Sequence, residues 1–257
     1  MASTILVTGG SGFAAAHIIR AFLNKGYNVK ATVRSEKRGK KSLQAIQNTI
    51  LFRVNTRIYL YRSGLEPCDK KAVVESNNAI LAYLAYLASK SFAEKAAFDF
   101  VKENKPKFTI SALCPPFIYG PLLHHVESPK ELNTSSNDIY RLFNGSEKEV
   151  PPTAFWSYVD VRDLAEAHVL AFEKSAAANQ RYLIAASAYS YQQICDIIRA
   201  KFPELRDTTS KGETGAPLPP VYRVDTTKAN NDLGVKYRSL EDTIGDTVNS
   251  LRSLEKA

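Results

Sequence analysis

The chain has 257 residues, 44% of them hydrophobic and 23% charged, which is an ordinary composition for a globular protein. No stretch approaches the roughly 18 uncharged apolar residues of a membrane helix, and the opening MASTILVTGGSG lacks the basic segment of a secretory signal. We therefore expect neither a membrane-spanning nor a secreted protein. The excess of positive charge behind the net charge of +8 is concentrated in residues 25–71, which carry 12 Lys and Arg against 3 Asp and Glu. No recognition motif accompanies this excess, so we expect no nucleic-acid partner.

The cysteines and histidines favour a reducing compartment and no metal site. Cys68, Cys114 and Cys195 are odd in number and have no CxxC spacing, which argues against a disulfide framework and a zinc site. Neither His124 nor His125 is followed by a carboxylate or a further histidine at position i+4. We predict a cytoplasmic protein that binds no metal.

The first 34 residues predict one βαβ unit. A β-branched run at 3–8 ends in Gly9-Gly10-Ser11-Gly12, apolar residues recur at helical spacing over 13–25, and a second strand follows at 27–33. Residues 35–48 are charged and predict a surface turn and a short helix. Residues 50–61 have the β-branched and aromatic content of one or two strands.

The rest of the chain alternates helices and strands. We predict a long helix over 78–104 and a buried strand over 108–114 that ends in Pro115-Pro116. The later patterns predict short helices around 136–143, strands at 155–159 and 180–185, and helices at 162–173, 191–201, 226–232 and 240–254. This order favours a single α/β domain over 1–257, with a parallel sheet and a small carboxy-terminal lobe. We expect this lobe, formed mainly by about 121–154 and 186–257, to select the substrate.

Small residues lie between the first strand and the first helix. Gly9, Gly12 and Ala15 follow a GxxGxxA spacing, which lets a backbone turn tightly and approach a pyrophosphate held by the helix N-terminus. A purely structural turn is the alternative, but the flanking strand and helix favour dinucleotide binding. The hydrolase motif GxSxG does not fit, because Phe13 interrupts it.

Arg34 stands at the end of the second predicted strand, where an NAD-specific fold would place Asp or Glu, and Arg38 follows it. Guanidinium groups suit a 2′-phosphate dianion. The pattern therefore favours NADP over NAD, with a solvated basic turn as the alternative.

Tyr86 and Lys90 lie one turn apart in the predicted helix 78–104, so a phenol and an ammonium share one face. Such a pair can donate a proton to a carbonyl and hold a nicotinamide ribose. The spacing by itself is not specific, and a tyrosine of the core is the alternative. The catalytic interpretation of the Tyr86–Lys90 pair is favoured because the pair follows the glycine turn and precedes the strand that ends in Pro115-Pro116.

Four segments together resemble the extended short-chain dehydrogenase/reductases, most closely the fungal NADPH-dependent methylglyoxal and ketone reductases, which are similar to dihydroflavonol reductases. The segments are VTGGSGF at the start, AYLASKSFAEKAAFDF in the long helix, LCPPFIYGP after it, and FWSYVDVRDLAEAHVLAFE further on. The resemblance covers residues 1 to about 40 and about 75 to 257.

The resemblance implies a Rossmann-type fold and hydride transfer from NADPH to the carbonyl of a small ketone or aldehyde, in a monomer or weak homodimer. It implies that Tyr86 donates the proton and that Lys90 holds the ribose and tunes Tyr86. The implied NADP(H) contacts are Gly9, Gly10, Gly12, Phe13 and Ala15 at the pyrophosphate, Arg34 and Arg38 at the 2′-phosphate, Pro115 and Ile118 beside the nicotinamide, and Ser135 nearby.

The interval between Arg34 and Tyr86 departs from the family pattern. It holds 51 residues, room for one βα unit of roughly 30 residues, whereas the family has three such units, one ending in a catalytic Ser or Thr. Ser63, in Tyr-Arg-Ser-Gly, does not match that setting. We therefore expect a chain about 80 residues short, with its sheet truncated in the middle and residues 50–61 filling part of the gap. An incorrectly spliced or predicted segment would explain the shortage.

Two functions remain open on the sequence. The first is an NADPH-dependent carbonyl reductase, and the second is a reductase-like protein that binds NADP(H) without chemistry because the serine segment is missing. A Ser or Thr hydroxyl within hydrogen-bond reach of the Tyr86 hydroxyl would favour the first.

Overall fold

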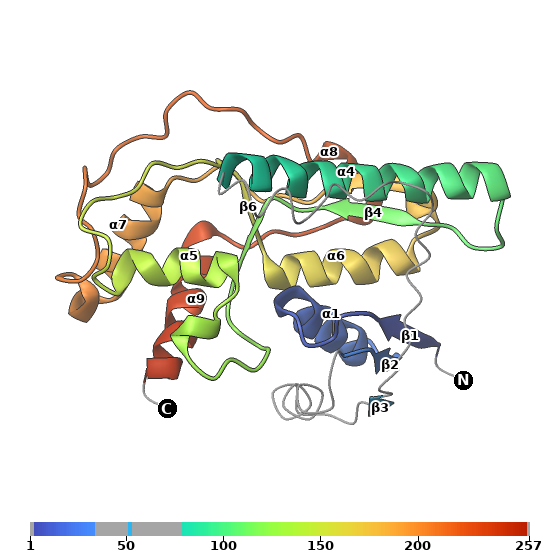
Figure 1. Ribbon diagram of the computed structural model, residues 1–257, viewed down its shortest axis with the longest axis horizontal. Helices are drawn as coiled ribbons and strands as arrows, with labels where there is room; N and C mark the ends of the chain where they lie inside the picture. The colour runs from blue at the N-terminus through green and yellow to red at the C-terminus, as the bar shows by residue number, and fades with distance from the viewer. Residues whose placement is uncertain (1–2, 34–50, 53–78, 256–257) are drawn as a thin grey trace.

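The computed structural model describes residues 3–33, 51–52 and 79–255, and only the backbone course of 51–52, 79–84 and 255 (Figure 1). Its strands are β1 (Thr4–Val7), β2 (Asn28–Ala31), β3 (Leu51–Phe52), β4 (Ser111–Cys114), β5 (Phe117–Tyr119), β6 (Tyr158–Asp160) and β7 (Gln180–Leu183). Its α-helices are α1 (Phe13–Asn24), α4 (Ala79–Asn104), α5 (Thr134–Phe143), α6 (Val161–Glu173), α7 (Tyr191–Lys201), α8 (Thr227–Leu233) and α9 (Leu240–Glu255). Short 3-10 helices are η1 (Pro129–Glu131), η2 (Ser175–Ala177) and η3 (Pro203–Leu205).

All strand pairs are parallel, which confirms the predicted α/β class. The described strands form three separate sheets, β1-β2-β3, β4-β7 and β5-β6. The predicted βαβ unit is confirmed, with Thr4 opposite Asn28 and Val7 opposite Ala31. Strand β5 was not predicted, because a three-residue strand directly after Pro115-Pro116 is too short to give an alternating pattern.

Strand β3 does not take the place that the sequence suggested. It pairs with the outer edge of β2, Lys30 opposite Leu51 and Ala31 opposite Phe52, so the sheet order is β1-β2-β3. The prediction that 50–61 fills the gap between β1 and β4 is therefore wrong for Leu51 and Phe52, and the rest of that segment lies outside the described residues.

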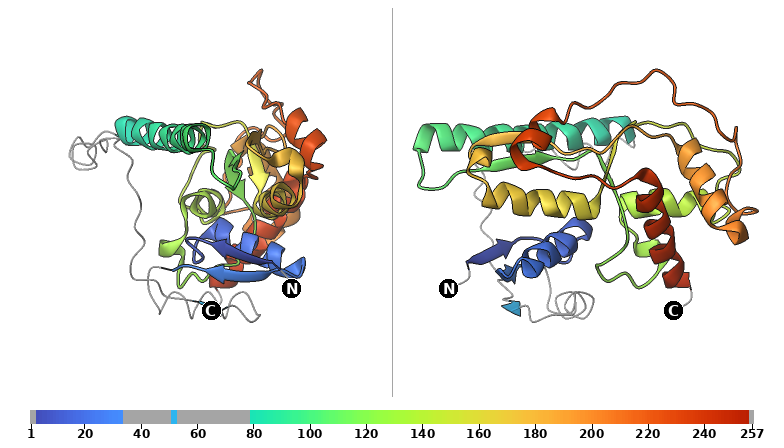
Figure 2. Two further views of the ribbon diagram at one scale, coloured as in Figure 1. Left: turned by 90° about the vertical axis from the view of Figure 1, so that its right-hand side faces the viewer. Right: turned by 180° about the vertical axis from the view of Figure 1, so that it is seen from behind.

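Helix α1 packs against α6, and this contact joins the amino-terminal sheet to the rest of the molecule. The shared core contains Ala16, Ile19 and Phe22 of α1 and Val169 of α6. Figures 1 and 2 show α6 between this unit and α4, which lies on the opposite side of the molecule from β1 and β2. Two polar contacts border the packed faces, Lys25 Nζ–Glu166 Oε1 at 3.2 Å and the Tyr27 hydroxyl donating to Glu173 at 2.9 Å.

Helix α4 confirms the predicted long helix and is fastened to the β4-β7 sheet through Glu94. Arg181 of β7 pairs with Glu94 Oε1 at 2.6 Å, and the Cys114 thiol donates to Glu94 Oε2 at 3.5 Å. The predicted strand at 108–114 is shorter and less buried than expected. Phe108 is exposed and stacks on Phe100, and β4 pairs only with β7 among the described strands, which leaves its other edge open.

The carboxy-terminal lobe has a core of its own, built from α5, α7, α9, β5 and β6. The Asp138 carboxylate lies inside it and accepts hydrogen bonds from the hydroxyls of Tyr119 and Tyr191, at 2.8 Å each, and from the Arg141 guanidinium at 2.9 Å. These donors satisfy a buried charge that would otherwise be costly. The predicted helices of this lobe are confirmed within one or two residues, and the strand predicted at 155–159 begins at Tyr158.

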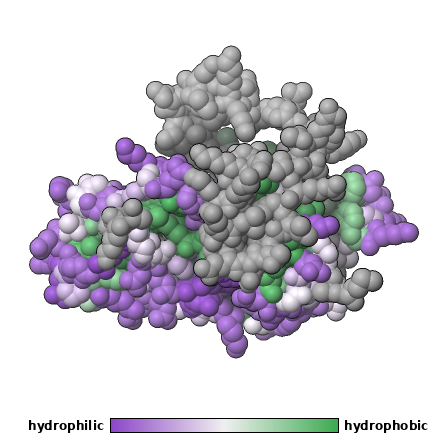
Figure 3. All heavy atoms as spheres, turned by 90° about the horizontal axis from the view of Figure 1, so that it is seen from below, coloured by the Kyte–Doolittle hydropathy of each residue, from purple (hydrophilic) through white to green (hydrophobic). Residues whose placement is uncertain are grey.

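The described surface is mixed in character. Seen from below, hydrophobic patches lie between hydrophilic ends (Figure 3). Leu6 of β1 is 65% exposed, which fits the unpaired edge of that strand among the described residues. None of the helices in the described ranges combines the length and apolarity that a membrane crossing requires.

His17 of α1 connects the amino-terminal unit to the loop after β5. Its ring donates from Nε2 to the Pro121 carbonyl at 2.9 Å, and only 7% of the residue is exposed. Burial lowers the pKa of His17 from its ordinary value of 6.5 to about 4. Burial also lowers the pKa of His124, which lies in the same loop, to about 4. Both rings are therefore neutral at pH 7.

We predict that the protein loses stability as the pH falls from 7 to 5. In that range His17 and His124 bind protons in the unfolded chain but stay neutral in the folded protein. The free energy of unfolding therefore decreases, by about 2 kcal/mol for His17. His17→Gln keeps a donor for Pro121 but does not titrate, so it should remove that share of the pH dependence. Urea unfolding at both pH values measures this, with the exposed His125→Gln as control. An unchanged pH dependence in His17→Gln would contradict the assignment.

Candidate active site

The turn between β1 and α1 has the geometry of a phosphate-binding turn. Gly9 adopts φ +68°, a conformation that favours glycine. A Cβ on Gly10 would lie 2.7 Å from the Cβ of Ala31, so only glycine lets the turn lie this close to β2. The Gly10 N–H donates to the Thr32 carbonyl at 2.8 Å, and the Gly12 N–H to the Gly9 carbonyl at 2.9 Å, which fixes the turn.

Helix α1 presents free backbone donors at this turn. Gly12 is its N-cap and offers no side-chain cap, so the N–H groups of Phe13, Ala14 and Ala15 have no partner within the helix. These donors and the positive end of the helix dipole suit a pyrophosphate. The site therefore fits the phosphates of a dinucleotide. Arg34 and Arg38, predicted at the 2′-phosphate, lie outside the described residues.

Phe13, the first residue of α1, packs against two histidine rings next to the turn. Its buried ring lies between the rings of His17 and His124, with centroids 5.9 and 5.6 Å away. The loop after β5 is thereby held against the first turn of α1. Sequence reasoning missed this role of both histidines. The i,i+4 spacing of Phe13 and His17 could have indicated the first contact, but nothing local indicated the second.

Tyr86 and Lys90 lie on one face of α4, as their spacing requires. Lys90 Nζ is 5.4 Å from the centroid of the Tyr86 ring, and Tyr86 is 58% exposed. The Ser89 hydroxyl donates to the Tyr86 carbonyl at 2.7 Å. Within the described ranges, no Ser or Thr hydroxyl is hydrogen-bonded to the Tyr86 hydroxyl. Tyr86 is thus a surface tyrosine in contact with a cation rather than a tyrosine of the core.

The helices that follow the glycine turn and that carry Tyr86 start toward the same end of the molecule. In Figure 1, α1, α4 and α6 all begin on the left, the side toward which β1 and β4 run. The carboxyl ends of parallel strands are where α/β folds bind ligands. The turn that precedes α1 and the amino-terminal part of α4, to which Tyr86 belongs, therefore lie toward the same end of the molecule, although α6 lies between the two helices.

The remaining predicted residues follow β4. Pro115 comes directly after Cys114, and Ile118 in β5 packs with Val159 in a core cluster that Ala14 also borders. Ser135 is the second residue of α5, and its hydroxyl accepts from the Asn133 amide at 3.0 Å. Ile118 therefore borders the same cluster as Ala14 of α1 and pairs with Val159 of β6. Ser135 lies in the lobe, and no contact in the described residues links it to Tyr86.

Metal ligands are not gathered in this region. In the parts of the chain that the structure describes, no three His, Cys, Asp or Glu side chains are placed to hold a metal ion.

Comparison with known proteins identifies relatives over the whole chain, although no family model matches. A ketoreductase from Aspergillus niger is 29% identical over 337 aligned positions, which cover 100% of this chain and 99% of the relative. The alignment is 80 positions longer than the 257 residues of this chain, which agrees with the predicted shortage of about 80 residues. The NADPH-dependent methylglyoxal reductase of Saccharomyces cerevisiae is 35% identical over 66% of this chain and 52% of its own length.

Solved structures agree with the sequence relatives. The crystal structure of Gre2 from Candida albicans superposes with a TM-score of 0.79 at 25% identity, covering 98% of this chain and 99% of that one. The predicted parallel α/β fold is thereby confirmed, and so is the resemblance inferred from the four sequence segments. Over its whole length, the chain is therefore similar to reductases of the extended short-chain dehydrogenase/reductase kind.

Proposed function

We propose that this chain reduces the carbonyl group of a small ketone or aldehyde to an alcohol with NADPH. The observation that carries the proposal is the contact between Lys90 and the exposed ring of Tyr86 on α4, a helix that starts toward the same end of the molecule as α1. The names of the relatives, a ketoreductase and an NADPH-dependent methylglyoxal reductase, support the same reaction. The cytoplasm and a monomer or weak homodimer remain predictions from the sequence.

The glycine turn would hold the cofactor. The free N–H groups that follow Gly12 bind the pyrophosphate, Gly9 and Gly10 keep the backbone close to it, and Phe13 supports the turn. Arg34 and Arg38 are proposed to select the 2′-phosphate, because a guanidinium matches a phosphate in charge and geometry. NADPH, when bound, supplies the hydride. Pro115, Ile118 and Ser135 are proposed to line the nicotinamide side.

Tyr86 performs the proton transfer in this proposal. As the carbonyl carbon accepts hydride, its oxygen becomes an alkoxide and takes the proton from the Tyr86 hydroxyl. The Lys90 ammonium lies beside the ring and stabilises the phenolate that remains. Because Tyr86 is exposed, a small substrate can reach its hydroxyl from solvent.

Tyr86→Phe tests the catalytic role. We expect the rate of methylglyoxal or ketone reduction to fall by about two to four orders of magnitude, because the proton donor is lost. The dissociation constant for NADPH should change less than twofold, since the ring and Lys90 remain. Steady-state assays and NADPH fluorescence titration measure the two quantities, with Tyr27→Phe as a matched control. Equal rates in the wild type and Tyr86→Phe would refute the assignment.

Cofactor choice can be tested separately by titrating NADPH and NADH against the protein. We expect NADPH to bind at least about tenfold more tightly, because a charge-assisted contact to the 2′-phosphate is lost with NADH. Gly10→Val should weaken both, since its side chain would collide with Ala31 of β2. If neither nucleotide binds the wild type, the proposed function fails outright.

A further inference from the structure

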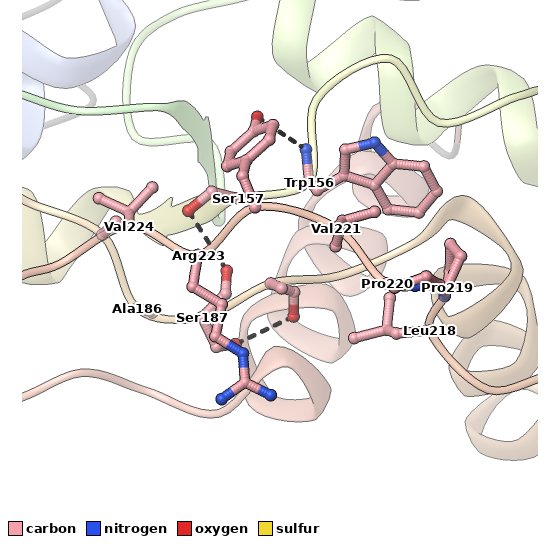
Figure 4. A pocket seen from close by; sticks show the side chains of 13 residues that line it. Trp156, Ser157, Ala186, Ser187, Leu218, Pro219, Pro220, Val221, Arg223 and Val224 are labelled. Atoms are coloured by element: carbon pink, nitrogen blue, oxygen red, sulfur yellow. Dashed lines mark hydrogen bonds between the residues drawn. The ribbon is translucent and has the colours of Figure 1, made fainter.

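A cavity of about 690 Å³ opens in the carboxy-terminal lobe between the start of β6, the segment that follows β7, and the loop 218–224. Figure 4 shows Trp156 and Pro219 on one side of it and the Arg223 guanidinium turned away from Trp156. Because we expect this lobe to select the substrate, this cavity belongs with the proposed function. A second hollow of the same lobe shares none of its lining residues and has a different character.

This second hollow, which we call the basic hollow, has a volume of about 320 Å³. Its walls are residues 145–148, which follow α5, and residues 206–211 together with Arg199 at the end of α7; both helices lie on the left of Figure 1. The Ser210 hydroxyl donates to the Glu147 carbonyl at 2.9 Å and joins the two walls. Small-molecule sites run from about 300 to 1,000 Å³, so the hollow has room for a small ligand.

Positive charge dominates the basic hollow. Four cations line it against two carboxylates, which are Lys148, Arg199, Arg206 and Lys211 against Glu147 and Asp207. Glu147 is already paired with Arg141, whose guanidinium donates to it at 2.6 Å. In the parts of the chain that the structure describes, none of the four lining cations forms a salt bridge. Such an uncompensated cluster of like charges favours a bound anion.

Two of these cations are held in place by backbone carbonyls. Arg199 donates from Nη1 to the Thr209 carbonyl at 2.9 Å and also to the Arg206 carbonyl. Arg206 donates from Nε to the Arg199 carbonyl at 2.8 Å. A carbonyl orients a guanidinium without cancelling its charge, and each guanidinium keeps further N–H groups for a ligand. Because the two groups are oriented before a ligand arrives, binding requires less ordering of side chains.

From these features we infer that the basic hollow binds the phosphate group of a small phosphorylated molecule, whose oxygens accept from Arg199 and Arg206. A phosphate monoester carries about −1.5 to −2 charge at pH 7 and three acceptor oxygens. It therefore matches the excess of cations better than a carboxylate, which carries a single charge. The inference goes beyond carbonyl reduction, because no residue of the basic hollow is assigned to NADPH or to proton transfer.

Calorimetric titration with glycerol 2-phosphate, without nucleotide and at constant ionic strength, tests the site. We expect saturable binding to the wild type, weaker binding of inorganic phosphate, and none of glycerol. Arg206→Gln should weaken binding of the ester about tenfold, because a charge-assisted contact is lost while the amide can still donate to the Arg199 carbonyl. Lys211→Gln should weaken it about threefold. Lys236→Gln, which removes an exposed charge of the same lobe outside the hollow, should bind like the wild type.

Three results would overturn the inference: no saturable binding of glycerol 2-phosphate, inorganic phosphate that binds as tightly as the ester, or an Arg206→Gln protein that binds like Lys236→Gln. The third result is also the one expected if the ester occupied the glycine turn instead. Circular dichroism confirms that the variants are folded. Failure here leaves the Tyr86 and NADPH experiments untouched. Their failure, in turn, leaves this site standing.

Discussion

The packing of α1 on α6 is the contact on which the arrangement of the molecule depends. Among the described strands, none joins β1 to β4, so the sheet cannot hold the amino-terminal unit in place. The burial of Ala16, Ile19 and Phe22 against Val169 does so instead, with the Lys25–Glu166 pair at the rim. Hydrophobic burial supplies most of this attachment, because the exposed ion pair contributes little.

This attachment sets how the two parts of the proposed active site relate. The glycine turn belongs to the α1 unit, whereas Tyr86 and Lys90 belong to α4, which Glu94 fastens to β4 and β7. The loop after β5 bridges them in part, since Pro121 accepts from His17. A change in the packing of α1 on α6, or of α4 on β4 and β7, would therefore move the phosphate site relative to the proton donor. Neither of these contacts includes a residue that takes part in the proposed reaction.

The shortness of the chain and the open sheet edges fit one another. The ketoreductase alignment leaves 80 positions opposite no residue, and a doubly wound sheet places a further strand directly beside its first one. In the described residues β1 and β4 instead keep an unpaired edge, and Leu6 is exposed. The carboxy-terminal lobe is independent of this gap, because the Asp138 network and the walls of the cavity and of the basic hollow come from residues beyond 115.

The sequence by itself determined the elements and the motif chemistry, because helical periodicity, glycine turns and the Tyr86–Lys90 spacing are local properties of the chain. It also determined that the chain is too short for the whole family pattern. Only the tertiary structure decided that β3 pairs outside β2, that Tyr86 is exposed, and that His17 reaches Pro121. It alone brought the walls of the basic hollow together, because Glu147 and Ser210, 63 positions apart, meet only through the packing of α5 and α7. Such contacts depend on which edges and faces remain free after folding, and no local pattern encodes that.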